Sequence, residues 1–206
     1  MGAQWLEDLS RIDRAIYEAV EGQQTPALDR PLRSLSNAAN RSVLWLAVAG
    51  LLALGGGAAG RRAAVRGLVS IGLVSVLVNL PMKALHRRPR PVRGEDAGLV
   101  HRQINMPTSS SFPSGHSASA FAFATAVGVE LPALAFPIRA LAAAVAYSRV
   151  HTGVHYPGDV LAGSLIGAVT GQIVSRSLDG VAFPGSRPAP TYGRRKERPH
   201  TEGPNT

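Results

Sequence analysis

Three short motifs in the second half of the chain collect residue types that handle phosphate. They supply three cations, two histidines, one carboxylate and a glycine-containing turn, in the order Lys83-x6-Arg90-Pro91, Pro113-Ser114-Gly115-His116 and Ser148-Arg149-x5-His155-x3-Asp159. During phosphoryl transfer, negative charge spreads over the equatorial phosphate oxygens, and preorganised cations and N–H donors stabilise it. The motifs therefore predict an enzyme that passes a phosphoryl group through a phosphohistidine, with neither a metal nor a cofactor.

The cations in these motifs differ in what they offer a phosphate group. Lys83 supplies a point charge, whereas Arg90 and Arg149 present planar guanidinium forks that can contact two oxygens at once. Three further arginines in the same basic stretch are interpreted instead as anchors at a membrane interface: Arg87, Arg88 and Arg93. The sequence thus predicts that the first three cations bind phosphate and that the other three do not.

The second motif places a histidine at the start of a predicted helix. A helix N-terminus presents free N–H groups, and Gly115 lets the backbone approach phosphate oxygens closely. Ser114 adds a side-chain or backbone hydrogen bond. His116 is then placed to protonate the leaving oxygen, which is a poor leaving group without that proton. The alternative is a histidine at a helix cap near the membrane interface.

The third motif pairs a histidine with a carboxylate four residues later. When Asp159 holds one imidazole nitrogen of His155, the other nitrogen is free to attack phosphorus. His151-x3-His155-x3-Asp159 also has the spacing of zinc ligands. Gly153 and Pro157 argue against one unbroken helix through all three, so we predict no metal site and expect His151 at the rim of the site or in a structural role.

The ordered triplet resembles the signature of the type-2 phosphatidic acid phosphatase superfamily, which includes membrane lipid phosphatases and soluble vanadium haloperoxidases. The resemblance covers Lys83 to Asp159 by motif and, through the helix pattern, about residues 43–177. It implies an all-α integral membrane helical bundle. It also implies that His155 is the nucleophile, that Asp159 orients it, that Arg149 grips the phosphate and that His116 is the acid.

Composition narrows the class of partner. The chain of 206 residues fits one domain, and 45% of its residues are hydrophobic. The absence of cysteine excludes disulfides and thiol nucleophiles. The net charge of +9 favours an anionic partner, either nucleic acid or a membrane. Because no nucleic-acid-binding pattern is present and aromatic residues make up only 5%, we expect membrane lipids and an anionic substrate. The oligomeric state stays open.

Apolar runs predict about five transmembrane helices within a lipid-phosphatase domain over residues 42–178. Two runs without charge cover residues 42–60 and 67–82, and the first contains three consecutive glycines that favour close helix packing. Three more spans are expected near residues 114–130, 137–148 and 158–174, the fourth of the five being the weakest because it is short and contains Arg139. The sequence predicts a multi-pass protein of the plasma membrane. Lysine and arginine are nearly balanced between the two sides, so the positive-inside rule assigns no orientation.

The two ends of the chain differ from this domain. Residues 1–41 are predicted to form amphipathic helices, because an apolar stripe recurs at helical spacing through Trp5, Leu9, Ile12, Ile16 and Val20. Such a helix lies on the membrane surface or packs as an ordinary amphipathic core helix, and the sequence leaves both open. Residues 179–206 are rich in proline, glycine and basic residues and predict a disordered basic tail. Asn40-Arg41-Ser42 fits a glycosylation pattern to which we give little weight.

The leading hypothesis is a membrane-embedded phosphatase for a lipid phosphomonoester or diphosphate. The motifs contact phosphate and not the lipid tail, so several substrates stay open: decaprenyl-phosphoryl phosphoribose, undecaprenyl diphosphate, phosphatidic acid and phosphatidylglycerol phosphate. One alternative is a vanadate-dependent haloperoxidase on the same site, because vanadate mimics the transferring phosphate. Another is a non-catalytic basic membrane protein. The apolar spans count against the first alternative, and the complete triplet counts against the second.

Overall fold

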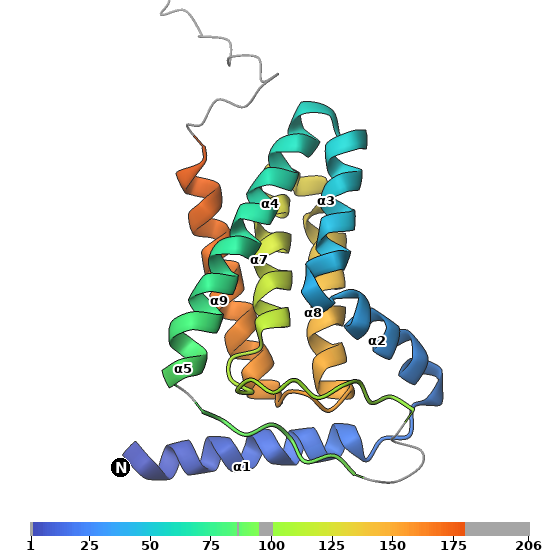
Figure 1. Ribbon diagram of the computed structural model, residues 1–206, viewed down its shortest axis with the longest axis vertical. Coiled ribbons are helices and arrows are strands. Elements are labelled where there is room, and N and C mark those ends of the chain that lie inside the picture. The colour runs from blue at the N-terminus through green and yellow to red at the C-terminus, as the bar shows by residue number, and fades with distance from the viewer. Residues whose placement is uncertain (1, 86, 95–100, 180–206) are drawn as a thin grey trace, which may run out of the picture.

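The computed structural model describes residues 2–85, 87–94 and 101–179, and this part of the chain is helical and contains no strand (Figure 1). The longer elements are α1 (Gly2–Glu21), α2 (Pro26–Ala38), α3 (Val43–Gly55), α4 (Gly57–Leu77), α7 (Gly115–Glu130), α8 (Ala135–His151) and α9 (Pro157–Ser177). Short segments join them: η1 (Asn40–Ser42), η2 (Val78–Met82), α5 (Lys83–Leu85) and η3 (Pro132–Leu134). The prediction of an all-α membrane bundle is confirmed. The proposed tail lies outside the described residues from position 180 onward.

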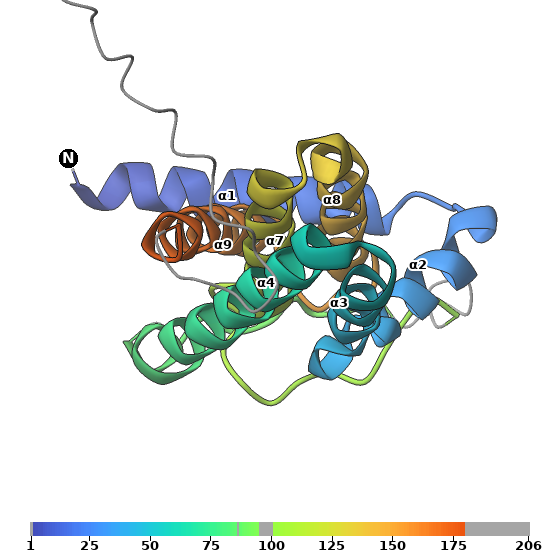
Figure 2. The ribbon, with the colours of Figure 1, turned by 90° about the horizontal axis from the view of Figure 1, so that it is seen from above.

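Helix α7 forms the centre of the bundle, with α4, α8 and α9 around it (Figure 2). On α9, Gly163, Gly167 and Gly171 recur every fourth residue and face α7. A Cβ atom at Gly163 would collide with the carbonyl oxygen of Ser114, and one at Gly167 with that of Ala118. Because these glycines let the two backbones approach closely, the start of α9 is fixed against the start of α7.

Three helical stretches are long and apolar enough to cross a membrane: Gly57–Met82, Pro132–His151 and Pro157–Ser177. A fourth crossing is possible for the bent pair Pro26–Ala38 and Asn40–Gly55, whose two parts meet at 67°. The five predicted helices are all present. However, α3 has only 13 residues and α7 only 16, and α7 is enclosed by its neighbours rather than by lipid.

The boundary between the first two predicted spans was placed wrongly. The first helix ends at Gly55 and α4 begins at Gly57, whose φ of +59° allows the chain to reverse. The run of glycines therefore forms a tight hairpin turn, and Arg61 and Arg62 lie inside α4. The prediction was wrong because the charges of Arg61 and Arg62 were taken to mark the end of the first span. The chain turns earlier, at Gly57.

Two of the three arginines within α4 form ion pairs at the end of the bundle that carries the hairpin. Arg62 pairs with Glu130 at 2.6 Å. Arg66 is buried and pairs with Asp179 at 2.8 Å and with Glu130 at 3.4 Å. These ion pairs explain how Arg62 and Arg66 are accommodated in a helix whose remainder crosses the membrane, whereas Arg61 is exposed.

Helix α1 lies across the opposite end of the bundle (Figure 1). The apolar stripe predicted for it faces outward, since Trp5, Leu9, Ile12 and Ile16 are between 47% and 55% exposed. Its other face meets the bundle, where Tyr17 is buried and packs edge-on against Tyr156. Val20, the last residue of the stripe, packs with Tyr17 against α8 and α9, so the exposed part of the stripe fits a helix on the membrane surface while its end joins the bundle.

Candidate active site

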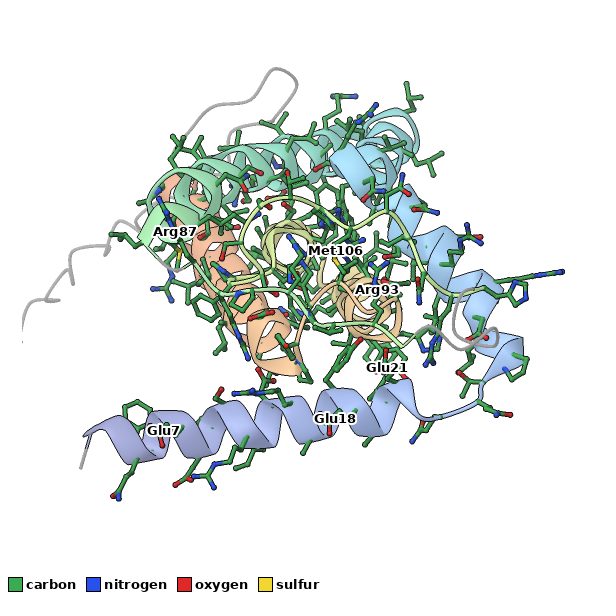
Figure 3. All side chains as sticks on the ribbon, turned by 60° about the horizontal axis from the view of Figure 1, so that its bottom comes forward. Glu7, Glu18, Glu21, Arg87, Arg93 and Met106 are labelled. Carbon is green, nitrogen blue, oxygen red and sulfur yellow. The ribbon has the colours of Figure 1, made fainter. Side chains whose placement is uncertain are left out.

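The three motifs meet at the end of the bundle that α1 crosses (Figure 3). Lys83 stands at the end of the long α4 segment, the second motif starts α7, and the third joins the end of α8 to the start of α9. The predicted site residues are close enough for their charges to act on one another. Burial, and then the charges of Arg90 and Arg149, lower the pKa of Lys83.

The proposed nucleophile occupies the turn between α8 and α9. Gly153, with φ +69°, reverses the chain there, and the backbone N–H of His155 donates to the carbonyl oxygen of Arg149 at 3.3 Å. The imidazole of His155 is buried, and its Nδ1 atom lies 3.6 Å from Oδ2 of Asp159. Such contacts are often long until substrate binds. Nδ1 thus faces the carboxylate without a hydrogen bond to it, and the orienting role of Asp159 stays a prediction.

The other imidazole nitrogen faces a cation. Nε2 of His155 lies 3.3 Å from the Arg90 guanidinium. Burial lowers the pKa of His155 to about 4; the contact with Asp159 opposes this shift, and Arg90 and Arg149 add to it. The imidazole is consequently neutral at neutral pH, which leaves a lone pair on Nε2 for attack.

Asp159 is fixed from three directions. Its Oδ2 atom accepts hydrogen bonds from the hydroxyl of Ser111 at 2.5 Å and from the backbone N–H of Tyr156 at 2.9 Å. Its Oδ1 atom accepts from Arg88 at 2.8 Å. The carboxylate is completely buried, so these donors replace the water that an ionised carboxylate needs.

Arg88 extends this network to α1. One of its nitrogens binds Asp159 and the other binds Asp13 at 2.6 Å, while the guanidinium stacks 4.3 Å from the centre of the Tyr156 ring. Asp13 also accepts from the backbone N–H of Gly158 at 2.6 Å. The interpretation of Arg88 as an interfacial anchor was wrong. The position of Arg88 inside the first motif could have indicated a role in the site. Nothing in the sequence connects Asp13 with Gly158, which lies 145 residues later.

The three cations that the sequence predicts to bind phosphate lie around the two histidines. Arg90 is held by the carbonyl oxygens of Val154 at 2.6 Å and Ser109 at 2.9 Å, and Lys83 donates to the Ser109 hydroxyl at 3.3 Å. Arg149 is buried and donates to the Ser36 hydroxyl at 2.7 Å, but its Nε atom has no partner among the described residues. A buried, unpaired guanidinium N–H is a donor available to an anion.

Arg93, two residues after the first motif, binds backbone oxygens. Arg93 donates to the carbonyl oxygens of Gly153 at 3.1 Å and Ile104 at 2.7 Å, and it lies near Met106 in Figure 3. It therefore ties the loop after α5 to the turn that carries His155. The interpretation of Arg93 as an interfacial anchor was wrong as well.

Ser114 caps the helix that carries His116. Its hydroxyl accepts from the N–H and the hydroxyl of Ser117 at 3.4 and 3.0 Å, and its own N–H donates to the carbonyl oxygen of Asp159 at 3.0 Å. The backbone N–H of Ser114 therefore links the second motif to the third and is not available to a phosphate. The amides at the very start of α7, those of Gly115 and His116, have no acceptor inside the helix and can meet a phosphate.

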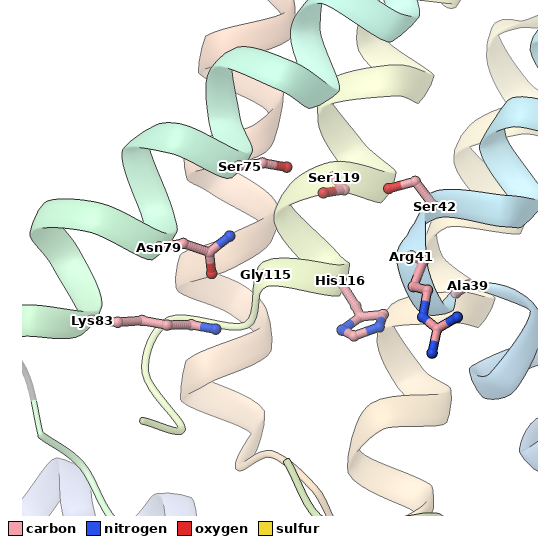
Figure 4. Close-up of a pocket in the computed structure, with 9 residues that line it drawn as sticks. All are labelled: Ala39, Arg41, Ser42, Ser75, Asn79, Lys83, Gly115, His116 and Ser119. Atoms are coloured by element: carbon pink, nitrogen blue, oxygen red, sulfur yellow. The ribbon is translucent and has the colours of Figure 1, made fainter. Parts of the chain in front are cut away.

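The proposed acid, His116, is oriented by an amide. Its Nε2 atom lies 2.9 Å from Oδ1 of Asn40, in the turn between α2 and α3. A pocket of about 160 Å³ opens beside it, with Lys83 on one side and Arg41 on the other (Figure 4). Asn40 was not predicted as a site residue, because its only sequence signal was the glycosylation pattern.

His151 belongs to a different contact. It points to α2, where its Nε2 atom lies 2.9 Å from Asp29, and both side chains are buried. Within the described residues, no group of three histidine, cysteine or acidic side chains is placed to hold a metal ion. His151 thus has the structural role that the sequence predicts, joining α8 to α2.

Comparisons with known proteins show the family of the chain. Residues 63–181 match the sequence profile of the PAP2 superfamily. The chain is 34% identical over 175 residues to the decaprenylphosphoryl-5-phosphoribose phosphatase of Mycobacterium tuberculosis, covering 80% of this chain and 91% of the relative. It is 28% identical over 108 residues to the undecaprenyl-diphosphatase BcrC of Bacillus subtilis, covering 52% of this chain and 54% of the relative. A solved structure, the transmembrane PAP2 type phosphatidylglycerolphosphate phosphatase from Bacillus subtilis, matches with a TM-score of 0.66 at 24% identity, covering 85% of this chain and 88% of that one.

Proposed function

The chain belongs to the PAP2 superfamily, and from this premise we propose that it removes phosphate from a membrane lipid through a phosphohistidine at His155. The protein is a membrane lipid phosphatase, as its relatives are, so the remaining question is which residues perform the reaction. The observation that carries our answer is the environment of His155. Its imidazole is buried and neutral, with one nitrogen toward Asp159 and the other toward Arg90.

In the first step, Nε2 of His155 attacks phosphorus, and the bond from phosphorus to the leaving oxygen breaks. His116, protonated in the complex with the anionic substrate, gives its proton to that oxygen, and the lipid alcohol departs. Asp159 stabilises the positive charge that develops on the His155 ring. In the second step, His116 takes a proton from water, the resulting hydroxide attacks phosphorus, and the phosphorus–nitrogen bond breaks. Inorganic phosphate leaves, and both histidines return to their starting states.

The cations and the start of α7 stabilise the negative charge that builds on the equatorial oxygens. Arg149 offers its unpaired Nε–H, Arg90 offers the guanidinium that already faces His155, and Lys83 adds a charge beside Gly115. Since these groups supply the charge that a metal supplies elsewhere, we propose that hydrolysis requires no divalent cation. Vanadate, which mimics the transferring phosphate, should inhibit.

For the substrate, we propose a polyprenyl-linked phosphate in the plasma membrane. The relative aligned over most of both chains acts on decaprenylphosphoryl-5-phosphoribose, whereas the match to the undecaprenyl-diphosphatase covers about half of this chain. The family and the relatives do not favour the haloperoxidase or the non-catalytic alternative.

The test is phosphate release by purified protein in detergent from defined lipid phosphates, with and without chelator. We expect release from a polyprenyl-linked monoester at a rate that chelation leaves unchanged. His155→Ala should abolish release, while His151→Ala, which alters a histidine of the same segment outside the site, should retain it if the variant folds. Activity lost on chelation and restored by zinc would overturn the metal-free mechanism, and full activity of His155→Ala would overturn the nucleophile.

A further inference from the structure

The pocket beside His116 contains more polar groups than a single phosphate requires. Lys83, Gly115 and His116 line the part next to the catalytic residues, and the pocket continues to Arg41 on the far side (Figure 4). Between these ends lie side chains of η2 and α7, among them Asn79 and Ser119. The lining therefore offers two cations separated by neutral hydrogen-bonding groups.

We propose that this pocket is a headgroup subsite for a hydroxylated group, such as a sugar, that joins the scissile phosphate to a second anion bound by Arg41. The inference rests on the proposed function, because it takes the phosphate next to His155 and His116 as the one that is removed. It adds the chemistry of the rest of the headgroup: hydroxyls opposite Asn79 and the serines, and a second phosphoryl group opposite Arg41.

The position of Asn79 supports a binding role. It lies in η2 (Val78–Met82), a π-helical stretch containing Pro81 that continues the membrane-spanning α4. π-Helical turns interrupt regular helix pairing and are frequent at functional sites. A polar side chain inside a membrane-spanning helix is costly unless it faces a partner or a cavity, and here Asn79 faces the pocket. Ser75, one turn earlier, lines the same pocket.

The backbone on the other side of the pocket provides a separate argument. Arg41 and Ser42 both adopt the left-handed conformation, with φ of 52° and 60°. Residues with a side chain rarely adopt it, and two in succession are unusual. Backbone strain of this kind is retained where a site needs a particular geometry. This turn sets Arg41 into the pocket lining while the preceding Asn40 contacts His116, so one short segment serves both the acid and the second anion.

The substrate classes differ in how well they match this lining. Phosphatidic acid carries one anionic group and no hydroxyl, and a polyprenyl diphosphate carries two adjacent anionic groups with no hydroxyl between them. A phosphoribose joined to a lipid phosphoryl group places hydroxyls between two separated anions, and phosphatidylglycerol phosphate places one hydroxyl between two. The groups in the pocket fit these last two classes, in which a hydroxylated unit joins two anions, and leave the lipid tail to lie outside the pocket.

Soluble mimics of the headgroup test the subsite. Ribose 1,5-bisphosphate carries both anions, and ribose 5-phosphate carries only one. Each is used as a competitor of p-nitrophenyl phosphate hydrolysis by the full-length protein in detergent. We expect the bisphosphate to bind about tenfold or more tightly than the monophosphate, the size of one charge-assisted hydrogen bond. The readout is the ratio of the two inhibition constants within each variant, so any general loss of rate cancels.

In Arg41→Gln this ratio should fall to about one. Arg61→Gln is the matched control, because Arg61 is an exposed arginine at the opposite end of α4; it should keep the parental ratio. A ratio near one in the parent, or an advantage that persists in Arg41→Gln, overturns the subsite while leaving the proposed function standing. If the parent hydrolyses neither p-nitrophenyl phosphate nor any lipid phosphate, the proposed function fails and the subsite fails with it.

Discussion

The two histidines of the site have opposite surroundings. His155 is buried against Asp159, and that carboxylate is itself held by Ser111, Tyr156 and Arg88. His116 has one amide partner and borders an open pocket. A nucleophile must present the same geometry to phosphorus at every turnover, whereas an acid must meet leaving oxygens in headgroups of different shape. The fold therefore holds the proposed nucleophile, His155, in one position and leaves a pocket beside the proposed acid, His116.

The two regions also differ in how far their supports lie from them in the sequence. The His155 region is held by contacts from α1, the loop after α5 and the start of α9, and it includes Asp13 of the first helix. The His116 region depends on the turn between α2 and α3. Substitutions in the first region should therefore change the rate on every substrate, and those in the second should change it selectively.

The largest effect expected beyond removal of the nucleophile itself belongs to Asp159→Asn. An amide keeps the shape but no longer stabilises a positive imidazole, so kcat should fall on all substrates by as much as about 10⁴-fold. Steady-state rates of this variant and of His155→Ala measure the difference, and His155→Ala should be the more severely impaired. Near-normal turnover by His155→Ala beside an inactive Asp159→Asn would reverse the assigned roles.

His116→Ala should discriminate between substrates. General acid catalysis contributes about 10²- to 10⁴-fold, so the rate on an alkyl lipid phosphate should fall by that amount. On p-nitrophenyl phosphate the first step should be nearly unaffected, since that leaving group needs little protonation. The measured quantity is the ratio of the phosphorylation rates on the two substrates, in the variant and in the parent. An equal loss on both would argue against His116 as the acid.

Asp13→Asn should reduce kcat by about tenfold with little change in KM, because one charge-assisted contact to Arg88 is weakened. The loss should be similar on lipid and p-nitrophenyl substrates, as expected of the His155 region. Asp8→Asn is the control on the same helix, where the acid pairs with Arg11 on the surface; such exposed pairs contribute little. If both variants behave alike, Asp13 has no part in positioning the nucleophile.

The smallest expected effect is a shift in the pH dependence of kcat/KM, and it is specific to the His155–Asp159 pair. His155 must be neutral to attack, so the acid limb of kcat/KM should lie near pH 4, where the imidazole becomes protonated as pH falls. Arg88→Gln removes a cation that faces Asp159, which raises the pKa of His155 and moves this limb to higher pH. A pH–rate profile from pH 3 to pH 8 gives both values. A limb unmoved in Arg88→Gln would show that Arg88 does not act on the His155–Asp159 pair.

Sequence reasoning could predict the helices and the groups that carry the chemistry, because motifs and apolar runs are local signals. Lys83, Arg90, Arg149 and the two histidines were found from type and spacing, and the structure gathers them at one end of the bundle. The same reasoning located the α1 stripe but not its docking face. That face combines Tyr17 with the polar Asp13, and a search for apolar periodicity passes over Asp13.

The parts that could not be predicted depend on distant contacts or on backbone conformation. Arg88 differs from its basic neighbours only because the fold places two carboxylates beside it. Asn40 acquires its role from a left-handed turn that has no glycine to signal it. The hairpin at Gly57 was missed because the arginines after it resembled the end of a membrane span.

The most direct test of the account is to find the phosphorylated residue. His116→Ala should still be phosphorylated by p-nitrophenyl phosphate but should lose the base that activates water, so the intermediate should accumulate. Alkaline quenching, digestion and mass spectrometry then locate the phosphate. The account predicts phosphohistidine at His155 and its absence from the double variant His116→Ala/His155→Ala. Phosphate on another residue, or continued turnover by the double variant, would contradict it.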